Sequence, residues 1–466
     1  MADEFTWRIE KSKYYWHPLY QYVEDVLHVY SIGMVRADLF HDYDSDKDKL
    51  TDDFNEILAF CWDLYNGVYN NTRAVVYHNH KPLYDLLKVF EPLDVTCYNG
   101  FWLFKYKKFI FLDDMGYSSD FFNLYDNLYR ECRSVVFNIH GENGLELVLT
   151  PQPKFFNVNE NEEWSDKEIR KRIEKAKVVE ITNKLDGSNQ NFRWYQGKVF
   201  GSGSSALDRN ESWRLDNGYK LITSEYEKML KAYPEYTFMF EYISPKNPVV
   251  VFYSQEQEGL YLFGMREVKT GKQLTYNEVL KIGHNFGVKC TDIYDNSYDD
   301  ILNQVDNYKS SEKEGWVIGL VDDKGNIFKA KLKITDYVLM HQAITKLISP
   351  NTIIRAIEED RWDDFKAKIP SAYKGIAMQI AGTVYRYNSF MQNTVMNYYN
   401  EIKHITDRKE FMIACENNVP KVFRSYVRNV YLNIPNNFIK TNAGHYYKLH
   451  EMESIMTKYK KEYCNA

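Results

Sequence analysis

Alternating apolar and polar positions predict β-strands in the central part of the chain. In residues 327–333, three lysines fall on one side of the alternation and apolar residues fall on the other. Residues 237–243 alternate in the same way and set Glu241 opposite three aromatic side chains. Residues 178–182 form a further run of strand length that ends shortly before Lys184. We therefore expect three strands, two of which present charged side chains on one face.

A hairpin is predicted at the end of this central region. Residues 322–326 are rich in turn-forming residues and separate the lysine segment from residues 315–321. The hairpin would place the lysines beside Glu314, which immediately precedes its first strand. Lysines on an isolated edge strand commonly prevent unwanted strand pairing. The functional interpretation of these lysines therefore depends on the motifs around them.

After about residue 341, the spacing of apolar residues changes to that of amphipathic helices. Ser349-Pro350-Asn351 begins one helix and Pro420 begins another. The second helix carries a basic stripe of Lys421, Arg424 and Arg428. A solvated helix surface and an RNA contact are equally good interpretations of this stripe. The pattern divides the chain into an N-terminal extension of unknown role, a core and a helical domain, at residues 1–85, 86–340 and 341–466.

Four short motifs follow one another in an order that suits covalent nucleotidyl transfer. They are Lys184-Leu185-Asp186-Gly187-Ser188, Phe240-Glu241-Tyr242, Glu314-Gly315-Trp316-Val317 and Lys331-Leu332-Lys333. The first motif alone is a weak signal and is typical of a surface turn, whereas the ordered series is far more specific. A lysine amine becomes nucleophilic when nearby cations or burial lower its pKa.

The series predicts a role for several of these residues. Lys184 is the candidate nucleophile, and Gly187 follows it so that a phosphate can approach a backbone without a Cβ atom. Glu241 is a candidate to hold a ribose hydroxyl or a metal ion, although an isolated glutamate on a half-buried strand is ordinarily only exposed.

With these motifs, the sequence resembles the RNA ligase 1 family of T-even phages, within the superfamily of covalent nucleotidyltransferases. Further segments that carry the resemblance are Glu131-Cys132-Arg133, Pro153-Lys154-Phe155-Phe156-Asn157, Leu262-Phe263-Gly264-Met265-Arg266-Glu267, and Tyr337-Val338 with His341. The resemblance implies an α+β fold. Its nucleotidyltransferase core would have ATP-grasp-like antiparallel sheets, preceded by an N-terminal extension and followed by an all-α C-terminal domain.

The resemblance also implies a set of site residues. Lys184 would receive AMP, and the ATP site would contain Tyr106, Arg133, Lys154, Phe156, Gly187, Glu241, Glu314, Lys331 and Lys333. Tyr337 would be a further functional residue, and Asp363 would bind a metal ion. The lysine motif can also be aligned on Lys329 and Lys331. Where the family has a lysine after the nucleophile strand, this chain has Gly201-Ser202-Gly203-Ser204-Ser205. Either backbone amides of this stretch or Lys198 could replace that lysine.

The implied activity is that of an ATP-dependent RNA ligase. It would join a 5′-phosphate to a 3′-hydroxyl through lysyl-AMP and RNA-adenylate intermediates, with ATP and Mg²⁺, for which Mn²⁺ can substitute. The implied partners are single-stranded or nicked RNA, with tRNA as a candidate, and an end-healing kinase or phosphatase. A DNA ligase or capping-type enzyme would instead have an all-β OB domain after Lys333. A non-catalytic RNA-binding relative would not need Lys184.

Composition and charge agree with this interpretation. The chain is 44% hydrophobic, and it has no apolar run of about 18 residues, so no membrane partner is expected. The six cysteines are scattered without a Cys-x-x-Cys pair, and the start is polar and acidic. We therefore expect an intracellular protein, encoded by a phage or virus and active in the cytoplasm of the host cell.

Charge is distributed unevenly along the chain. Residues 1–118 contain 12 lysines and arginines against 19 acidic residues, a net charge of −7. Residues 341–466 contain 18 against 12, a net charge of +6. This asymmetry indicates that the C-terminal domain faces RNA.

Overall fold

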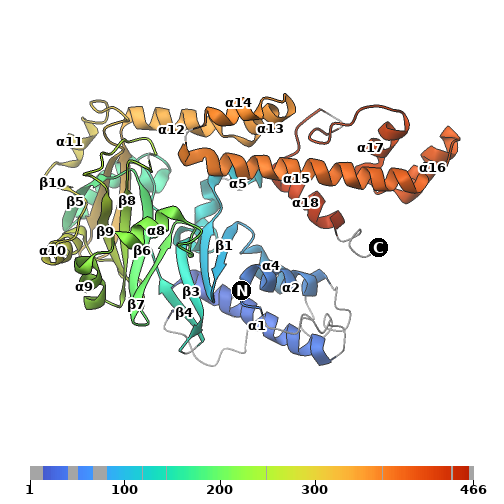
Figure 1. The fold of residues 1–466 in the computed structure, drawn as a ribbon. Coiled ribbons are helices and arrows are strands. Elements are labelled where there is room, and N and C mark those ends of the chain that lie inside the picture. Colours follow the sequence, from blue (N-terminus) through green and yellow to red (C-terminus); the bar gives the residue numbers. More distant parts are fainter. Residues whose placement is uncertain are drawn as a thin grey trace. The chain divides into compact units, whose positions relative to one another are not determined.

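The computed structural model describes residues 14–39, 51–66, 81–117, 119–142, 144–247, 249–369, 371–441 and 444–460. The chain combines helices with antiparallel sheets and divides into two compact units (Figure 1). The first unit lies within Met1–Lys107 and Ser118–Met340, and the second lies within Lys108–Tyr117 and His341–Ala466. The predicted combination of helices, antiparallel sheets and a helical C-terminal region is confirmed.

The first unit contains three antiparallel sheets of four strands each. The first sheet has the order β1 (Leu93–Tyr98), β2 (Phe101–Tyr106), β3 (Arg133–Gly141) and β4 (Gly144–Leu149). The second has the order β10 (Ile293–Tyr294), β5 (Val178–Lys184), β11 (Gly315–Val321) and β12 (Ile327–Lys333). The third has the order β7 (Lys198–Gly203), β6 (Ser188–Tyr195), β8 (Tyr236–Ile243) and β9 (Gly259–Glu267). All strands predicted from alternation are present.

Three N-terminal helices belong to the first unit and pack on its first sheet. They are α1 (Pro18–Leu39), α2 (Phe54–Asn66) and α4 (Lys81–Lys88). Phe54 opens α2 and is fully buried, with its ring 5.0 Å from Trp102 and 4.9 Å from Phe104 in β2. Aromatic pairs at these distances contribute beyond the area that they bury. The described part of residues 1–85 therefore shares a core with the first sheet.

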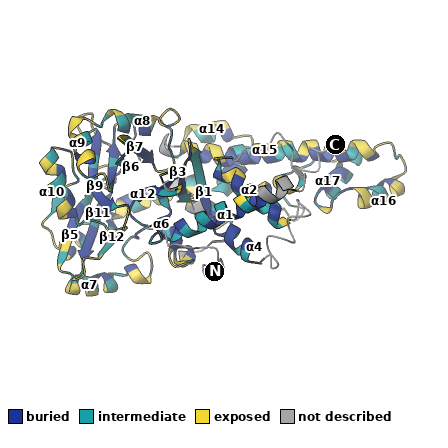
Figure 2. Ribbon diagram, turned by 90° about the horizontal axis from the view of Figure 1, so that it is seen from below, coloured by how far each residue is buried: buried dark blue, intermediate teal, exposed yellow. Residues whose placement is uncertain are grey.

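The remaining helices of the first unit are short and cover the sheets. They are η3 (Ser119–Asn123), α6 (Leu128–Glu131), η4 (Glu162–Trp164), α7 (Asp166–Lys175), α8 (Trp213–Lys220), α9 (Ser224–Ala232), α10 (Tyr276–Phe286) and α11 (Tyr298–Leu302). Helix α10 begins with a capping box between Thr275 and Glu278 and ends at Gly287, whose φ of 70° suits glycine. In Figure 2 the strands carry many buried positions, whereas the outer faces of α7, α9 and α10 are exposed.

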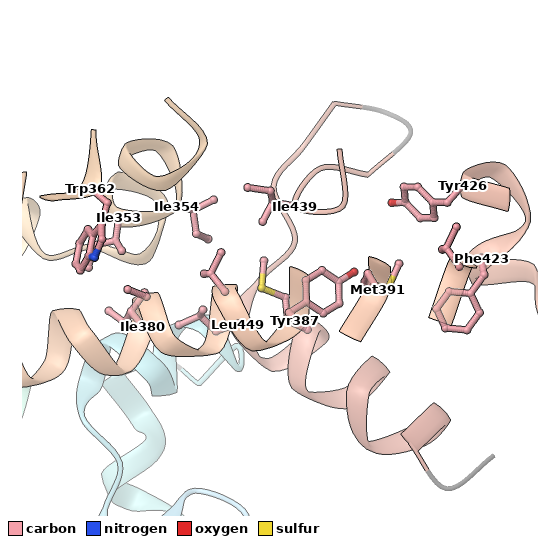
Figure 3. Packing of buried hydrophobic residues seen from close by; sticks show 14 of the residues in the cluster. Ile353, Ile354, Trp362, Ile380, Tyr387, Met391, Phe423, Tyr426, Ile439 and Leu449 are labelled. Carbon is pink, nitrogen blue, oxygen red and sulfur yellow. The ribbon is translucent and has the colours of Figure 1, made fainter. Parts of the chain in front are cut away.

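The second unit is helical. Its elements are α5 (Phe109–Asp114), the end of α12 (Thr335–Leu347), α13 (Pro350–Glu358), α14 (Trp362–Ala367), α15 (Ser371–Ile402), α16 (Arg408–Asn418), α17 (Lys421–Tyr431) and α18 (Leu449–Lys460). Figure 3 shows Ile380, Tyr387 and Met391 of α15 beside buried residues of neighbouring helices. The helix starts predicted at Ser349 and Pro420 are confirmed. The described residues after Lys333 are thus helical where a DNA ligase would have an OB domain.

The basic stripe predicted on α17 is partly paired with a carboxylate. Glu416 forms ion pairs with both Arg424, at 2.6 Å, and Arg428. Two of the three cations in the predicted basic stripe are therefore partly neutralised, which favours the solvated-surface interpretation. In the part of the chain that the structure describes, no helix is both long enough and apolar enough to cross a membrane.

Candidate active site

The site is built on one face of the second sheet. Strand β11 lies between β5 and β12, with Gly315 opposite both Lys184 and Lys333. Because side chains alternate, Glu180, Thr182 and Lys184 of β5 share this face with the lysines at positions 329, 331 and 333 of β12. The structure therefore brings the predicted nucleophile and the predicted lysine face together on one surface.

Glu314 links the nucleophile to the lysine strand. Its side chain is 4% exposed, and its two oxygens lie 2.6 Å from Lys184 Nζ and 3.0 Å from Lys333 Nζ. Burial alone would raise the pKa of Glu314, but the two ammonium groups lower it below its usual value. A buried carboxylate between two cations is a strong geometric constraint, so Glu314 fixes the position of Lys184 Nζ.

The pKa of Lys184 differs from the expectation for a free nucleophile. Burial is the largest influence and would lower this pKa, but Glu314, Glu241 and Asp186 together raise it. Lys184 is thus held in its protonated form before any nucleotide binds. The lowered lysine pKa that nucleophilic attack requires is found instead at Lys331, where burial and four surrounding cations lower the pKa well below its usual value.

The three lysines of β12 have different surroundings. Lys331 Nζ lies 4.5 Å from the centre of the Phe155 ring, and Lys329 Nζ donates a hydrogen bond to Gln152 Oε1 at 2.8 Å. Burial lowers the pKa of Lys329 to about 8. Lys333 is bound to Glu314. Lys331 is therefore the β12 lysine that is most free to meet a ligand anion.

Asp186, in the turn after Lys184, is a buried anchor. Its Oδ2 accepts hydrogen bonds at 2.8 Å from the backbone N–H groups of both Val250 and Val251. Its Oδ1 accepts a hydrogen bond at 2.9 Å from the hydroxyl of Tyr337. The Tyr337 ring also lies 4.8 Å from Lys333 Nζ. Tyr337 thus contacts the nucleophile turn and the lysine strand, which gives a structural basis for the functional role predicted for it.

Gly187 permits a close approach, but of a different group from the one expected. A Cβ atom at this position would lie 2.3 Å from the carbonyl oxygen of Tyr242. The Gly187 N–H donates a hydrogen bond at 3.0 Å to Glu241 Oε1. The glycine therefore allows the nucleophile turn to pack against β8. Burial raises the pKa of Glu241 to about 8, so this carboxyl is poised to change its charge near neutral pH.

A cavity of about 370 Å³ opens over these groups. Its lining combines cations, carboxylates, amides and hydroxyls with aromatic and aliphatic walls, which is typical of a site for a polar small molecule. The lining residues are Arg133, Gln152, Phe155, Glu180, Thr182, Asn183, Lys184, Leu185, Gly187, Ser188, Asn189, Ser204, Glu241, Phe263, Tyr276, Thr291, Val317, Gly319, Lys329 and Lys331.

Some predicted residues lie beside this cavity without lining it. Phe155, and not Phe156, faces the cavity, while Phe156 packs 4.7 Å from Trp164. Lys154 lies over the Phe156 ring at 4.9 Å, and burial lowers its pKa to about 8. The positive charge of Lys154 contributes to the lowered pKa of Lys331. Tyr106 packs edge-on against Phe122 at 5.0 Å, at the outer side of the same aromatic group.

The metal site predicted at Asp363 is not assembled in the described residues. Asp363 opens α14 with a side chain that is 96% exposed, and Lys366 lies 4.0 Å away. In the described ranges, no group of three histidine, cysteine or carboxylate side chains is arranged to hold a metal ion. The described lining of the cavity near Lys184 includes two carboxylates, Glu180 and Glu241, and Glu180 already accepts hydrogen bonds from the start of α10.

Sequence reasoning missed several residues of the site. Glu180 is buried and accepts hydrogen bonds at 2.7 Å from Tyr276 N and at 2.8 Å from Asn277 N, at the start of α10. The available signal was its position, since Glu180 alternates with Lys184 on the same face of β5. Ser204, from the glycine-serine stretch, lines the cavity, whereas Lys198 lies at the other end of β7.

Comparison with known proteins agrees with this geometry. A family model described as RNA ligase matches residues 131–337. Among solved structures, the chain is similar to a Naegleria gruberi RNA ligase with PPi, with 19% identity and a TM-score of 0.29, over 38% of this chain and 55% of that chain. It is also similar to an archaeal ATP-dependent RNA ligase, with 14% identity and a TM-score of 0.41, over 82% of this chain and 96% of that chain.

A variant of the Naegleria gruberi enzyme with ATP and Mn is similar at 20% identity and a TM-score of 0.29, over 37% of this chain and 54% of that chain. This chain thus spans about half of the length of the Naegleria relatives that it matches. The family match contains the whole lining of the cavity and Tyr337. The resemblance predicted from the motifs is confirmed by this match of residues 131–337 to the RNA ligase family model.

Proposed function

We propose that the chain is an ATP-dependent RNA ligase whose nucleophile is Lys184. One observation carries the proposal: Lys184 lines a cavity of about 370 Å³ together with Lys329 and Lys331, inside the segment matched by the RNA ligase family. The three sheets around this cavity would then be a nucleotidyltransferase core of the ATP-grasp-like kind. A nucleotide with its phosphates toward the lysines fits both the size and the charge of the cavity.

The cations of the cavity are suited to bind phosphates. Burial and the charges of Arg133, Lys154, Lys184 and Lys333 lower the pKa of Lys331 well below its usual value, so its protonated form is disfavoured when no anion is present. A polyphosphate would relieve the repulsion and allow Lys331 to take up a proton. Charge would then develop on the α-phosphate against preorganised donors, which is the usual source of rate in phosphoryl transfer.

Lys184 must lose a proton before it attacks. Its amine lies 2.6 Å from Glu314, so the carboxylate both aligns the nitrogen and stabilises its charged form. Once this proton has passed to solvent, the nitrogen lone pair forms a bond to the α-phosphorus. The bond from phosphorus to the bridging oxygen breaks, and pyrophosphate leaves with that electron pair. Glu314 remains bound to Lys333 and keeps the turn in place.

Glu241 is the residue whose surroundings fit a divalent cation. It faces the cavity, and Mg²⁺ or Mn²⁺ is commonly bound by one or two carboxylates together with substrate phosphates. When bound, such an ion would neutralise charge on the phosphates. Burial keeps the pKa of Glu241 at about 8, so a cation would also drive its ionisation.

The later steps would transfer AMP from Lys184 to an RNA 5′-phosphate and then join that end to a 3′-hydroxyl. The net charge of +6 in residues 341–466 supports an RNA contact by the helical unit.

The helical unit contains a cavity of about 860 Å³ whose lining includes Asn388, Gln392, Asn433, Asn436 and Asn437. Amide side chains can pair with the edges of unstacked bases. Nicked tRNA, with ends prepared by a kinase or phosphatase, is the substrate that we propose.

The proposal is tested by intact-mass analysis after incubation with ATP and Mg²⁺. We expect one added AMP, which Lys184→Ala abolishes and 5′-phosphorylated RNA removes. Lys313→Met is the matched control, because burial lowers the pKa of Lys313 to about 8, as reactivity of an amine would require, but its side chain lies against Tyr294, outside the cavity. Labelling that survives Lys184→Ala would refute the nucleophile. Labelling by GTP alone, or transfer only to DNA, would favour a capping-type enzyme or a DNA ligase.

A further inference from the structure

An exposed phenylalanine lies on a loop that is anchored to the nucleophile turn. Phe252 is 74% exposed, the highest value among the large apolar side chains described. It belongs to residues 244–258, which connect β8 to β9 (Figure 1). On one side of it, the Val251 N–H donates to Asp186 Oδ2 at 2.8 Å. On the other side, the hydroxyl of Tyr253 accepts a hydrogen bond from Asp186 N at 2.9 Å.

These two anchors fix the backbone on both sides of Phe252. The Phe252 N–H also donates to the carbonyl oxygen of Ser311 at 3.4 Å. The backbone that carries this exposed ring is therefore bonded to the turn that follows Lys184. Isolated exposed apolar residues are common, but an exposed aromatic ring on a backbone anchored to the nucleophile turn is a ready surface for stacking.

A second exposed aromatic residue is connected to the same turn. Trp213 opens α8 and is 45% exposed, and the Arg214 guanidinium lies 4.8 Å from the centre of its ring. Arg214 Nε donates to Asn247 Oδ1 at 2.7 Å. Asn247 Nδ2 in turn donates at 2.8 Å to the hydroxyl of Ser188, which lines the cavity beside Lys184. Two hydrogen bonds thus link Arg214 to the nucleophile motif.

Arg214 differs from its neighbouring arginine in its charge balance. Arg209 is bound to Asp216 through two hydrogen bonds, at 3.0 and 2.8 Å. Among the described residues, no carboxylate forms an ion pair with Arg214, and the one hydrogen bond donated by its guanidinium uses Nε. Its two terminal nitrogens remain available for an anion. A guanidinium with this freedom is suited to bind a phosphate through two parallel hydrogen bonds.

We propose that Trp213, Arg214 and Phe252 form a docking site for the 5′-phosphorylated end of single-stranded RNA, beside Lys184. Arg214 binds a phosphate, and the two rings stack on unpaired bases. This proposal rests on the proposed function, because an RNA end must reach the AMP carried by Lys184. A terminal phosphate carries more charge than an internal one, so the unpaired guanidinium favours this end of the strand.

The test uses the full chain and measures two quantities separately. The first is the rate of Lys184 adenylylation without RNA. The second is the affinity for a 5′-phosphorylated single-stranded oligoribonucleotide, compared with the same strand that has a 5′-hydroxyl. We expect Phe252→Leu and Trp213→Leu each to weaken RNA binding roughly tenfold, whereas Phe252→Tyr restores it, because stacking requires an aromatic face.

Arg214→Gln is expected to remove the preference for the 5′-phosphate and to reduce the salt dependence of binding by about one counterion. The matched controls are Arg209→Gln, at the arginine already paired with Asp216, and Tyr98→Leu, at a β1 residue that is 38% exposed. Both should leave RNA affinity unchanged.

Three results would overturn the docking site. The first is full RNA affinity in Phe252→Leu and Arg214→Gln. The second is an equal effect of the Arg209→Gln control. The third is a loss of adenylylation as large as the loss of RNA affinity, which would mean that the loop only positions Asp186. Failure of adenylylation in the unmodified chain would instead refute the proposed function itself, so the two failures are distinguishable.

Discussion

The two units each contain a cavity, and the smaller cavity holds the reactive groups. In the first unit, the cavity over the second sheet has a volume of about 370 Å³, and its lining includes Lys184, Glu241 and two lysines of β12, Lys329 and Lys331. The cavity in the second unit has a volume of about 860 Å³ and is lined mainly by amides and apolar side chains, with Glu358 as its only carboxylate in the described lining. Size alone would therefore select the wrong site for chemistry.

The two units differ in how deeply their paired charges are buried. In the first unit, Glu314 is 4% exposed and pairs with two lysines, Lys184 and Lys333. Little water therefore screens the interaction between these charges. In the second unit, Glu416 is 54% exposed and is also shared between two cations, Arg424 and Arg428. Interactions between charges are much stronger where water is excluded. Buried charge creates perturbed pKa values, which are a property of reactive sites.

The sharpest test of this contrast removes one cation from the smaller cavity. Lys331→Met is expected to reduce the rate of Lys184 adenylylation by roughly 100-fold to 1000-fold, because one preorganised donor to developing phosphate charge is lost. Lys329→Met should cost less, since Lys329 Nζ is already bound to Gln152 at 2.8 Å. Single-turnover measurement with ATP gives both rates. A larger loss at Lys329 would show that the motif is aligned two residues earlier.

The next test compares the two shared carboxylates directly. Glu314→Gln should lower the free energy of unfolding by about 3 kcal/mol, because it leaves buried lysines without a counterion. Glu416→Gln should lower it by less than about 1 kcal/mol, because that pair is exposed to solvent and salt. Urea denaturation of both variants measures the two values. Equal costs would remove the basis of the comparison between the units.

The sequence was sufficient to predict the elements of the active site but only some of their contacts. Alternation in residues 327–333 predicted the face that carries Lys331, and the motif order placed Glu314 beside it. Both are local properties, set by a period of two residues and a short hairpin. The helical C-terminal region followed in the same way from the change to helical spacing after about residue 341, whereas the α+β fold class was implied by the family resemblance.

Long-range partners were not predictable from these local patterns. Tyr337 binds Asp186 across 151 positions of sequence, and Glu180 binds Asn277 across 97. Such contacts depend on how the sheets pair and twist, which no single segment specifies. For the same reason, the sequence did not predict the surroundings of Gly187. The space beside it, which we expected a phosphate to approach, is occupied by the carbonyl of Tyr242. The choice between Phe155 and Phe156 likewise depended on which side of the segment meets β12.

A third prediction concerns pH, because Lys329 in the lining of the smaller cavity and Lys154 beside it both have pKa values lowered to about 8. Burial lowers the pKa of Lys154 to about 8, so this residue is largely neutral above that pH in the free protein. Bound phosphate favours the charged form, and ATP binding must then take up a proton. Affinity for ATP should therefore fall as pH rises above about 8, by at most tenfold per unit for each lysine involved.

Calorimetry in two buffers of different ionisation enthalpy measures this proton uptake. The Lys184→Ala variant is the suitable protein, because it binds ATP without forming an adduct. Lys154→Arg should flatten the pH dependence, since an arginine keeps its charge throughout this range. Lys313→Met should not alter it, although the pKa of Lys313 is also lowered to about 8. Binding without proton exchange would contradict the charge state assigned to the cavity.

The smallest effect is expected at the amide-lined cavity of the second unit. Asn388→Ala and Gln392→Ala should each weaken RNA joining by roughly fivefold, the value of about one hydrogen bond to a base edge. Both residues lie on α15, where alanine is a favourable replacement. Asn433 is a poor choice, because its φ of 55° would strain an alanine. Asn393→Ala, on the same helix but outside the cavity lining, is the control. Because the described lining of this cavity has no lysine, arginine or histidine to stabilise phosphate charge, the rate of Lys184 adenylylation should stay constant in all three variants. A fall in adenylylation together with joining would show that this cavity supports the reaction, and the contrast between a reactive site and a recognition surface would then fail.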